Sequence, residues 1–339
     1  MAKKTFTLQQ RLSAFVDWIA TDSGKEDEIR KRMANIRGAI AAKAKADNLV
    51  VRSTPNSGSF ATRTGLRRHM RGLSEVEGQD VDLPFVVSPV TKDDETLDAL
   101  LPRFERYAKE SYPNTDRETT KSSVNLKFDD KVFFDLVPML GTKSPDRQIL
   151  LRKGGEQRET SIQKHIEFVS ARTGKSNEQA GRVKFNEMVR LLKWWRCFRE
   201  ADAISIEQMP SFLVTLLASY AFDARGVKAR YAETLADWFG FLAHAVRQRT
   251  KISFADFGTK YTVDANAKWS VFDPVAGDNN VVSKWTGLMC DELTEWLEEG
   301  RDAVLEAIAA FDAGKETEGL DCLVLVLGTP VRHHSEPTP

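Results

Sequence analysis

Apolar residues near the N-terminus recur every three or four positions, which is the spacing of one face of a helix. The pattern predicts a helix over 6–20 and a longer one over 23–47. Residues 23–26, Ser-Gly-Lys-Glu, match a capping box at the start of the second helix. The apolar stripe of the long helix consists of Ile29, Met33, Ile36 and Ile40. We therefore predict that this helix is the spine on which a sheet packs.

Between residues 49 and 139 the pattern changes to short runs rich in β-branched and aromatic residues. Such runs, bounded by turn residues, are typical of strands. An amphipathic helix interrupts them after the second run, so the predicted order is strand, strand, helix, strand, strand. The predicted strands cover 49–54, 81–87, 124–128 and 131–139, and the predicted helix covers 96–112.

From about residue 160 onward the periodicity is helical. A loop over 252–271 separates the last two candidate helices, and 322–327 reads as a short apolar strand or the end of a helix. The predicted helices cover 161–172, 177–201, 211–225, 229–248 and 282–313.

The paired glycines at 154 and 155 mark a break between the mixed part of the chain and the helical part. We predict an α+β fold with a first unit over 1–155, a helical lobe over 156–328 and a disordered tail over 329–339. A boundary of this kind is a natural place for a ligand cleft.

Charge and composition narrow the function classes. The chain has 339 residues, with 49 basic and 49 acidic side chains and a net charge of zero, which argues against a uniformly basic nucleic-acid-binding surface but not against a local basic groove. The three cysteines lack the paired spacing of a zinc site. No leader pattern and no apolar run of about 20 residues is found, so we expect a cytoplasmic protein.

Three carboxylates are the candidate metal-binding residues. Asp80 and Asp82 are two positions apart in a predicted strand, so their side chains project to the same face. Asp135 lies inside an apolar run, where a carboxylate is costly unless it is paired or metal-bound. Mg²⁺ prefers oxygen ligands, and a third carboxylate allows two ions. These residues predict a site for divalent metal and a triphosphate.

A glycine-serine turn supplies the second half of this predicted site. Gly58 allows close approach of the backbone, and the Ser59 hydroxyl at the start of a helix can bind phosphate oxygens. The spacer between Ser59 and Asp80 is basic, and its residues either form a solvated loop or steer phosphates, the acceptor nucleotide or a partner. These basic residues are Arg63, Arg67, Arg68, His69 and Arg71.

The residues above resemble the signature of the polymerase-β-like nucleotidyltransferases. Three further stretches, 188–195, 210–217 and 272–282, resemble 2′-5′-oligoadenylate synthetases and their bacterial relatives, the CD-NTases of anti-phage (CBASS) operons. These are similar to cyclic GMP-AMP synthase and DncV. The likeness spans about residues 8–315, and 159–162 resembles the branch that works with HORMA-domain partners. The spacer after Ser59 departs from the family, since it is longer and more basic than usual.

This resemblance implies a mixed catalytic sheet with a long N-terminal spine helix, joined to a helical lobe that closes the nucleotide cleft. It implies that Asp80, Asp82 and Asp135 are catalytic and bind two Mg²⁺ ions, with Mn²⁺ as a substitute. It also implies that Gly58, Ser59, Lys193 and Ser211 grip the triphosphate. For the last two, a surface lysine and a helix N-cap are the alternative interpretations.

The implied function is synthesis of a cyclic di- or trinucleotide messenger from NTPs, with adenine expected. The alternatives are a linear oligoadenylate synthetase, transfer of a nucleotide to RNA or a small molecule, and a non-catalytic nucleotide sensor. Implied partners are NTP substrates, ATP first, and a HORMA-domain activator with an AAA+ remodeler. Nucleic acid is expected only as an activator, and no membrane is involved.

Two remaining patterns have structural interpretations. Residues 174–176, Gly-Lys-Ser, resemble the end of a phosphate-binding P-loop, but the glycine required five positions earlier is Val169. We therefore predict a turn that stops a helix there. Asp273 and the two asparagines at 279 and 280 match a family signature near the nucleotide, and they suit a structural turn equally well.

Overall fold

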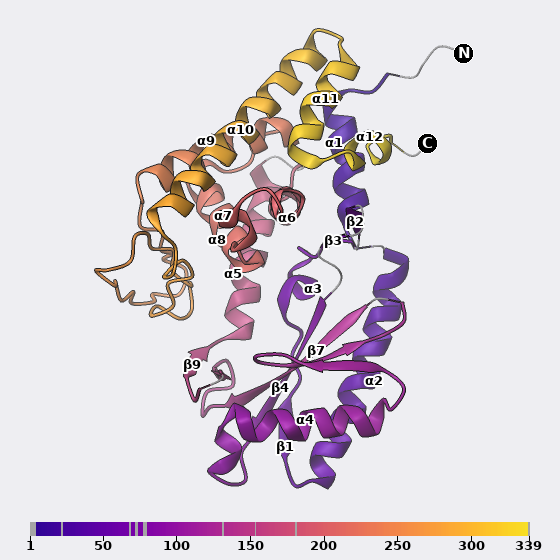
Figure 1. The fold of residues 1–339 in the computed structure, drawn as a ribbon, viewed down its shortest axis with the longest axis vertical. Coiled ribbons are helices and arrows are strands. Elements are labelled where there is room, and N and C mark those ends of the chain that lie inside the picture. Colours follow the sequence, from indigo (N-terminus) through magenta and orange to yellow (C-terminus); the bar gives the residue numbers. More distant parts are fainter. Residues whose placement is uncertain are drawn as a thin grey trace. The chain divides into compact units, whose positions relative to one another are not determined.

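The computed structural model describes residues 5–21, 23–67, 69–71, 74–76, 80–130, 132–152, 154–179 and 182–337 (Figure 1). The chain divides into two compact units. The sheet unit comprises Thr21–Met70 and Glu77–Glu167, and the helical unit comprises Met1–Ala20, Arg71–Val76 and Phe168–Pro339. This division differs from the predicted boundary at residue 155 in two ways. The first helix, Leu8–Ile19, groups with the helical unit, and the boundary between Glu167 and Phe168 falls inside the helix Ile162–Gln179.

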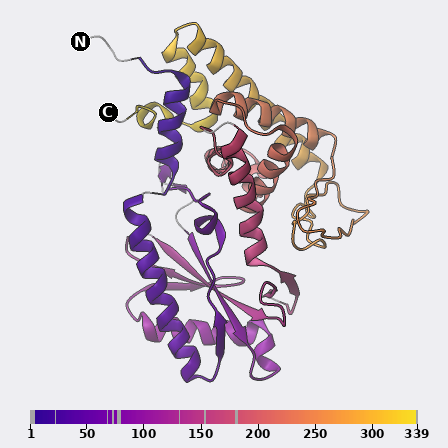
Figure 2. The same ribbon diagram turned by 180° about the vertical axis from the view of Figure 1, so that it is seen from behind.

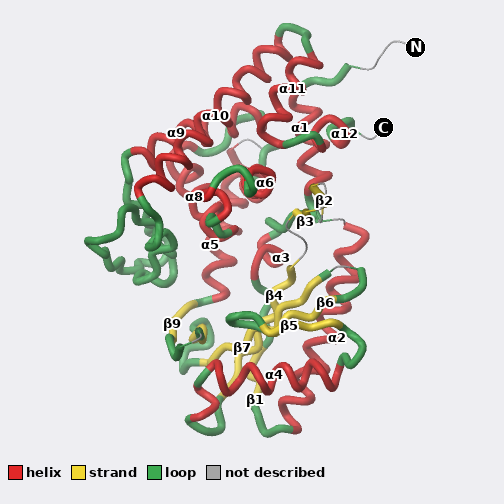
Figure 3. Tube along the Cα trace, in the orientation of Figure 1, coloured by secondary structure: helices red, strands yellow, loops and turns green. Residues whose placement is uncertain are grey.

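The sheet unit is built on a mixed sheet with the strand order β1-β4-β7-β6-β5, to which β8 adds by pairing with β7, and β9 by pairing with β8 (Figure 3). β4 and β7 run parallel, whereas β1–β4, β5–β6, β6–β7, β7–β8 and β8–β9 are antiparallel pairs. The strands are β1 Val50–Ser53, β4 Asp80–Ser88, β5 Asp116–Thr119, β6 Val124–Lys127, β7 Phe133–Gly141, β8 Gln148–Leu151 and β9 Gln157–Thr160. The short strands β2 His69–Arg71 and β3 Ser74–Val76 pair separately.

Two long helices, α2 (Ser23–Ala46) and α4 (Leu97–Ser111), cover one face of this sheet (Figure 2). The predicted stripe of α2 is buried, with exposures of 0–3%, and packs in one core with α4 and the inward residues of β4. The predicted spine helix is therefore confirmed. This unit also contains α3 (Gly58–Thr62), the 3₁₀ turn η1 (Asp93–Glu95) and the start of α5 (Ile162–Gln179). The predicted start of β7, Lys131, lies outside the described residues.

A polar network ties the end of α2 to α4. Asp47 accepts hydrogen bonds from the Tyr107 hydroxyl and from Arg103 Nε. The Tyr107 hydrogen bond, above all, holds the pKa of Asp47 below its ordinary value of 3.8. A carboxyl group with a lowered folded-state pKa stabilises the fold above its unfolded pKa, and this contribution is lost as pH falls through the folded value.

Asp47→Asn should accordingly lower the melting temperature at pH 7 by roughly 2–4 °C, the effect expected for about one hydrogen bond in a chain of this size. Below pH 4 the difference between wild type and variant should shrink progressively, because Asp47 becomes protonated first in the unfolded state and, as pH falls through the lower folded-state pKa, in the folded state as well. Melting curves of both proteins from pH 7 to pH 3 check this. A difference that stays constant over this range would contradict it.

The helical unit contains α1 and most of α5, followed by the helices α6 to α12. Its helices are α1 Leu8–Ile19, α5 Ile162–Gln179, α6 Phe185–Arg199, α7 Ile204–Glu207, α8 Ser211–Arg225, α9 Tyr231–Arg247, α10 Gly287–Asp312, α11 Glu316–Leu327 and α12 Pro330–His334. A long irregular segment separates α9 from α10, as predicted (Figure 1). None of the helices in the described part of the chain is both long enough and apolar enough to cross a bilayer.

Two sequence predictions in this unit are wrong. α5 continues through Gly174-Lys175-Ser176 instead of stopping there, and the Ser176 hydroxyl donates to the Thr173 carbonyl within the helix. The tail predicted to be disordered contains α12, whose His334 ring stacks on Trp18 of α1 at a centroid distance of 3.9 Å. Packing against α1 gives the short segment an ordered conformation that its composition does not predict.

Candidate active site

The sheet register brings the predicted carboxylates to one face. Asp82 of β4 is paired directly with Asp135 of the parallel strand β7, and adjacent strands lie about 4.7–4.9 Å apart. Asp80 is two residues before Asp82 and therefore faces the same way. Val81 and Leu83 alternate with these carboxylates and are buried in the core on the opposite face. The three carboxylates therefore share the sheet face that α2 and α4 leave uncovered.

Gly58, the first residue of α3, lies directly against Asp82. A Cβ atom at position 58 would be 2.0 Å from Asp82 Oδ2, far closer than any real contact. Gly58 also has φ +66°, a conformation that side chains with a Cβ rarely adopt. The glycine is therefore required twice, for its backbone conformation and for the space that the Asp82 carboxylate occupies.

Ser59 follows in the first turn of α3. Its carbonyl accepts the Thr64 amide at 2.9 Å, which closes the far end of this short helix. Within the described part of the chain, no hydrogen bond holds the Ser59 hydroxyl. Before α3, the Arg37 guanidinium of the spine helix donates to the Pro55 carbonyl at 2.9 Å, and burial lowers the pKa of this guanidinium. The turn is thus anchored while the serine hydroxyl stays available.

Asp135 has two neighbours that sequence reasoning missed. Ser123 Oγ donates to Asp135 Oδ1 at 2.8 Å, and Asn125 Nδ2 donates to the same oxygen at 3.2 Å. Asn125 is also the cross-strand partner of Asp135 in the antiparallel pair β6–β7. The signal was present, since Val124 and Leu126 are predicted to point inward, and the alternation then places Ser123 and Asn125 on the carboxylate face.

These residues fit a hard divalent cation in donor type, because every candidate ligand is a carboxylate oxygen. The parallel register fits too, since it places two of the carboxylates on neighbouring strands. Among the described residues, no group of three His, Cys, Asp or Glu side chains already has the arrangement of a metal site. Asp82 instead faces Gly58, and Asp135 faces Ser123 and Asn125.

The basic spacer after Ser59 can be described only in part. Arg63 adopts a left-handed conformation, φ 55°, and ends α3. Arg68 lies outside the described residues, and the structure describes no side chains for His69 or Arg71.

In the helical unit, Lys193 lies on α6 and is only 4% exposed, so its interpretation as a surface lysine is wrong. Ser211 is the first residue of α8, and the N-cap is Pro210, so the N-cap interpretation of Ser211 is also wrong. A buried lysine requires a compensating polar or charged partner. Contacts of Lys193 and Ser211 with an anionic ligand stay a prediction from the sequence.

Asp273 and the asparagines at 279 and 280, which match a family signature, lie in a turn. Asp273 Oδ1 accepts the amides of Val275 and Ala276, and its Oδ2 accepts from the Asn279 side chain. Asn280 bridges the amides of Val271 and Val282 through Oδ1. These hydrogen bonds support the structural interpretation of this segment.

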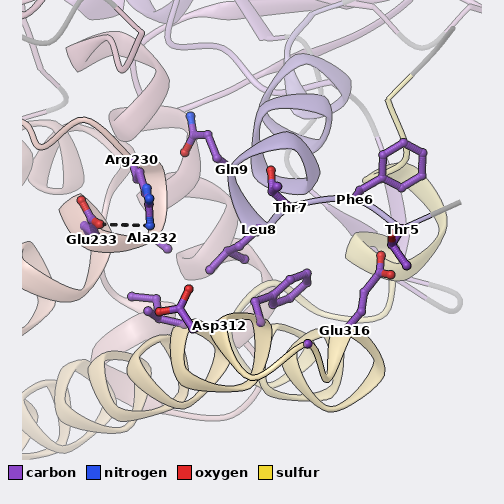
Figure 4. Close-up of a pocket in the computed structure, with 13 residues that line it drawn as sticks. Thr5, Phe6, Thr7, Leu8, Gln9, Arg230, Ala232, Glu233, Asp312 and Glu316 are labelled. Carbon is purple, nitrogen blue, oxygen red and sulfur yellow. Dashed lines mark ion pairs between the residues drawn. The ribbon is translucent and has the colours of Figure 1, made fainter.

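A cavity of about 460 Å³ lies elsewhere in the helical unit, between the start of α1, the start of α9 and the junction of α10 with α11 (Figure 4). Three of its lining residues, Glu233, Asp312 and Glu316, are acidic, and none of the predicted site residues is among those described as lining it. Two of these carboxylates are paired with arginines, Glu233 with Arg230 and Glu316 with Arg11. Because none of the predicted site residues lines this cavity, the carboxylate face of the sheet remains the candidate site.

Residues 6–172 match the model of the family described as SMODS, the Second Messenger Oligonucleotide or Dinucleotide Synthetase domain. This part of the chain is therefore a domain of the SMODS family. Joining nucleotides is nucleotidyl transfer, and the chain is accordingly a nucleotidyltransferase of the kind that makes oligonucleotide or dinucleotide second messengers. No curated protein matches the sequence.

Solved CD-NTase structures share this fold over nearly the whole chain. Escherichia coli MS115-1 CdnC, solved with ATP, is 22% identical, with a TM-score of 0.78 over 98% of this chain and 99% of CdnC. CdnC in complex with a HORMA protein is 23% identical, with a TM-score of 0.75 over 95% and 98% of the two chains. Bradyrhizobium diazoefficiens CdnG, solved with GTP, is 18% identical, with a TM-score of 0.71 over 96% of each chain. The predicted polymerase-β-like architecture is thereby confirmed.

Proposed function

We propose that the carboxylate face of the sheet is the catalytic centre of a metal-dependent cyclic oligonucleotide synthase. The observation that carries this proposal is the pairing of Asp82 with Asp135 across β4 and β7, with Gly58 against Asp82. Asp80 and Asp82 would hold two divalent ions, Mg²⁺ or Mn²⁺, and Asp135 would share one of them. Bound ions would supply charge neutralisation at the α-phosphate and at the leaving pyrophosphate.

In this proposal Asp135 also accepts the proton of the attacking ribose hydroxyl. The Ser59 hydroxyl, with the close backbone approach that Gly58 permits, binds the triphosphate. The bond from the ribose oxygen to the α-phosphorus forms as the bond to pyrophosphate breaks, and positioning with electrostatic stabilisation provides most of the rate enhancement.

Lys193 and Ser211 of the helical unit would contact the same triphosphate. The burial of Lys193 supports this assignment, since a lysine held away from water gains most from an anionic partner. Because a lysine is a point charge with three donors, it can follow the phosphates through a reaction in which they change position.

The proposed product is a cyclic di- or trinucleotide that contains adenine and acts in anti-phage (CBASS) signalling. Support comes from the family description and from the ATP bound to CdnC, a protein similar to this chain. The complex of CdnC with a HORMA protein supports a HORMA-domain activator for this chain as well. An AAA+ remodeler would then reset that partner.

The product assay for this function uses the full chain with all four NTPs and Mg²⁺, with and without its HORMA partner. Products are treated with phosphatase and identified by mass spectrometry. We expect a phosphatase-resistant oligonucleotide, because a ring has no terminal phosphate to lose. Phosphatase-sensitive linear oligoadenylate, nucleotide attached to another acceptor, or no product in either condition would contradict the proposal.

A further inference from the structure

One row of residues crosses four strands on the carboxylate face. Glu118 pairs with Asn125, Asn125 with Asp135, and Asp135 with Asp82. Asn125 therefore lies between Asp135 and Glu118 in this row. A neutral donor there avoids the repulsion that a third adjacent acid would introduce.

Within the described residues, the Asn125 side chain makes a hydrogen bond through its NH₂ group and none through its carbonyl oxygen. A carboxylate only accepts, so the amide must turn its NH₂ group toward Asp135. Its own carbonyl oxygen is then buried without a hydrogen-bond partner among the described residues, although Asn125 is 9% exposed. Leaving a buried acceptor unpaired costs about 1–3 kcal/mol.

Ser123 is held in place by the turn between β5 and β6. Its amide donates to Thr120 Oγ1 at 3.0 Å, and the two hydroxyl oxygens are 2.8 Å apart. The single hydroxyl hydrogen of Ser123 goes to Asp135, so Thr120 is the donor between the two hydroxyls. The turn thereby fixes the direction of the Ser123 hydroxyl.

Both donors reach the same oxygen of Asp135. Within the described residues, Oδ1 accepts both hydrogen bonds and Oδ2 accepts none. Two donors on one carboxylate oxygen fix the rotation of the group and leave the other oxygen for a different partner.

We propose that Ser123 and Asn125 are positioning residues that hold Asp135 Oδ1, so that Oδ2 is presented to the divalent ion and the acceptor hydroxyl. This inference rests on the proposed metal site of Asp135. Hydrogen-bond partners that orient a ligating carboxylate typically contribute about 10–100-fold to metal affinity or activity.

The test is a Mn²⁺ titration of the full chain, with free Mn²⁺ followed by electron paramagnetic resonance, beside the kcat and KM of NTP turnover. The variants are Ser123→Ala and Asn125→Leu, each of which removes one donor with little change in volume. Ser123→Thr keeps the hydroxyl. Ser122→Ala is the matched control, because this neighbouring serine makes no side-chain hydrogen bond to Asp135. Asp135→Asn defines the proposed metal site itself.

We expect Ser123→Ala and Asn125→Leu each to raise the Kd for Mn²⁺ about 10-fold and to lower kcat with KM for NTP nearly unchanged. Ser123→Thr and Ser122→Ala should stay within about threefold of wild type. Wild-type Mn²⁺ affinity in both donor variants, with affinity lost in Asp135→Asn, would overturn this inference alone. Wild-type affinity in Asp135→Asn would overturn the metal site on which it rests. If Asn125→Leu fails to fold, Ser123→Ala decides the question, since it removes a single oxygen atom.

Discussion

Replacing Asp80 and Asp82 together by Asn is expected to reduce nucleotide synthesis at least about 1,000-fold, because the electrostatic stabilisation of the developing charge is lost. The fold should survive. Both residues lie on the face of β4 opposite the core, and Asp80 is exposed. The melting temperature should therefore stay within about 3 °C of wild type.

Initial rates of pyrophosphate release, with melting curves on the same preparations, provide the measurement. Asp116→Asn is the matched control, since Asp116 is an exposed aspartate on the edge strand of the same sheet. Its rate should match wild type. Synthesis retained in the double variant would remove these two residues from the mechanism.

Gly58→Ala is expected to have the second largest effect, a loss of synthesis of at least about 100-fold. The new Cβ atom would lie 2.0 Å from Asp82 Oδ2, so the carboxylate must leave its present position. The positive φ of residue 58 adds strain of about 1–2 kcal/mol, which should lower the melting temperature by a few degrees.

Gly155→Ala separates the two causes. Gly155 also has a positive φ, 82°, but a Cβ atom there would meet nothing within 4 Å. It should show the strain without the loss of synthesis. Equal activity in Gly58→Ala and wild type would show that contact between residue 58 and Asp82 plays no part in catalysis.

The sequence predicts those features of the fold that local periodicity determines. The stripe of α2 and the alternation around Asp80 and Asp82 follow from side-chain spacing alone. Alternation also gives the face on which Asp135 lies, but it does not tell which residues stand opposite one another. The pairing of Asp82 with Asp135, and of Asp135 with Asn125, depends on strand register, which long-range packing decides.

Other features are missed because tertiary packing overrides a local signal. A glycine inside a helix costs only about 1 kcal/mol relative to alanine, so α5 can pass through Gly174 once its apolar face is buried. The burial of Lys193 could not be read from its position among polar and apolar neighbours in α6. The contact between Gly58 and Asp82 joins residues from a turn and a strand, and no local pattern encodes it.

The most direct test of the catalytic centre is a crystal structure of the full chain with Mn²⁺ and a non-hydrolysable ATP analogue, with the metal located by anomalous scattering. The account predicts two Mn²⁺ ions about 3.5–4 Å apart on the carboxylate face. Both should be bound by Asp80 and Asp82, and one by Asp135 Oδ2. The triphosphate should contact Ser59, Lys193 and Ser211. Metal bound away from these carboxylates, or a triphosphate in another part of the chain, would contradict the account.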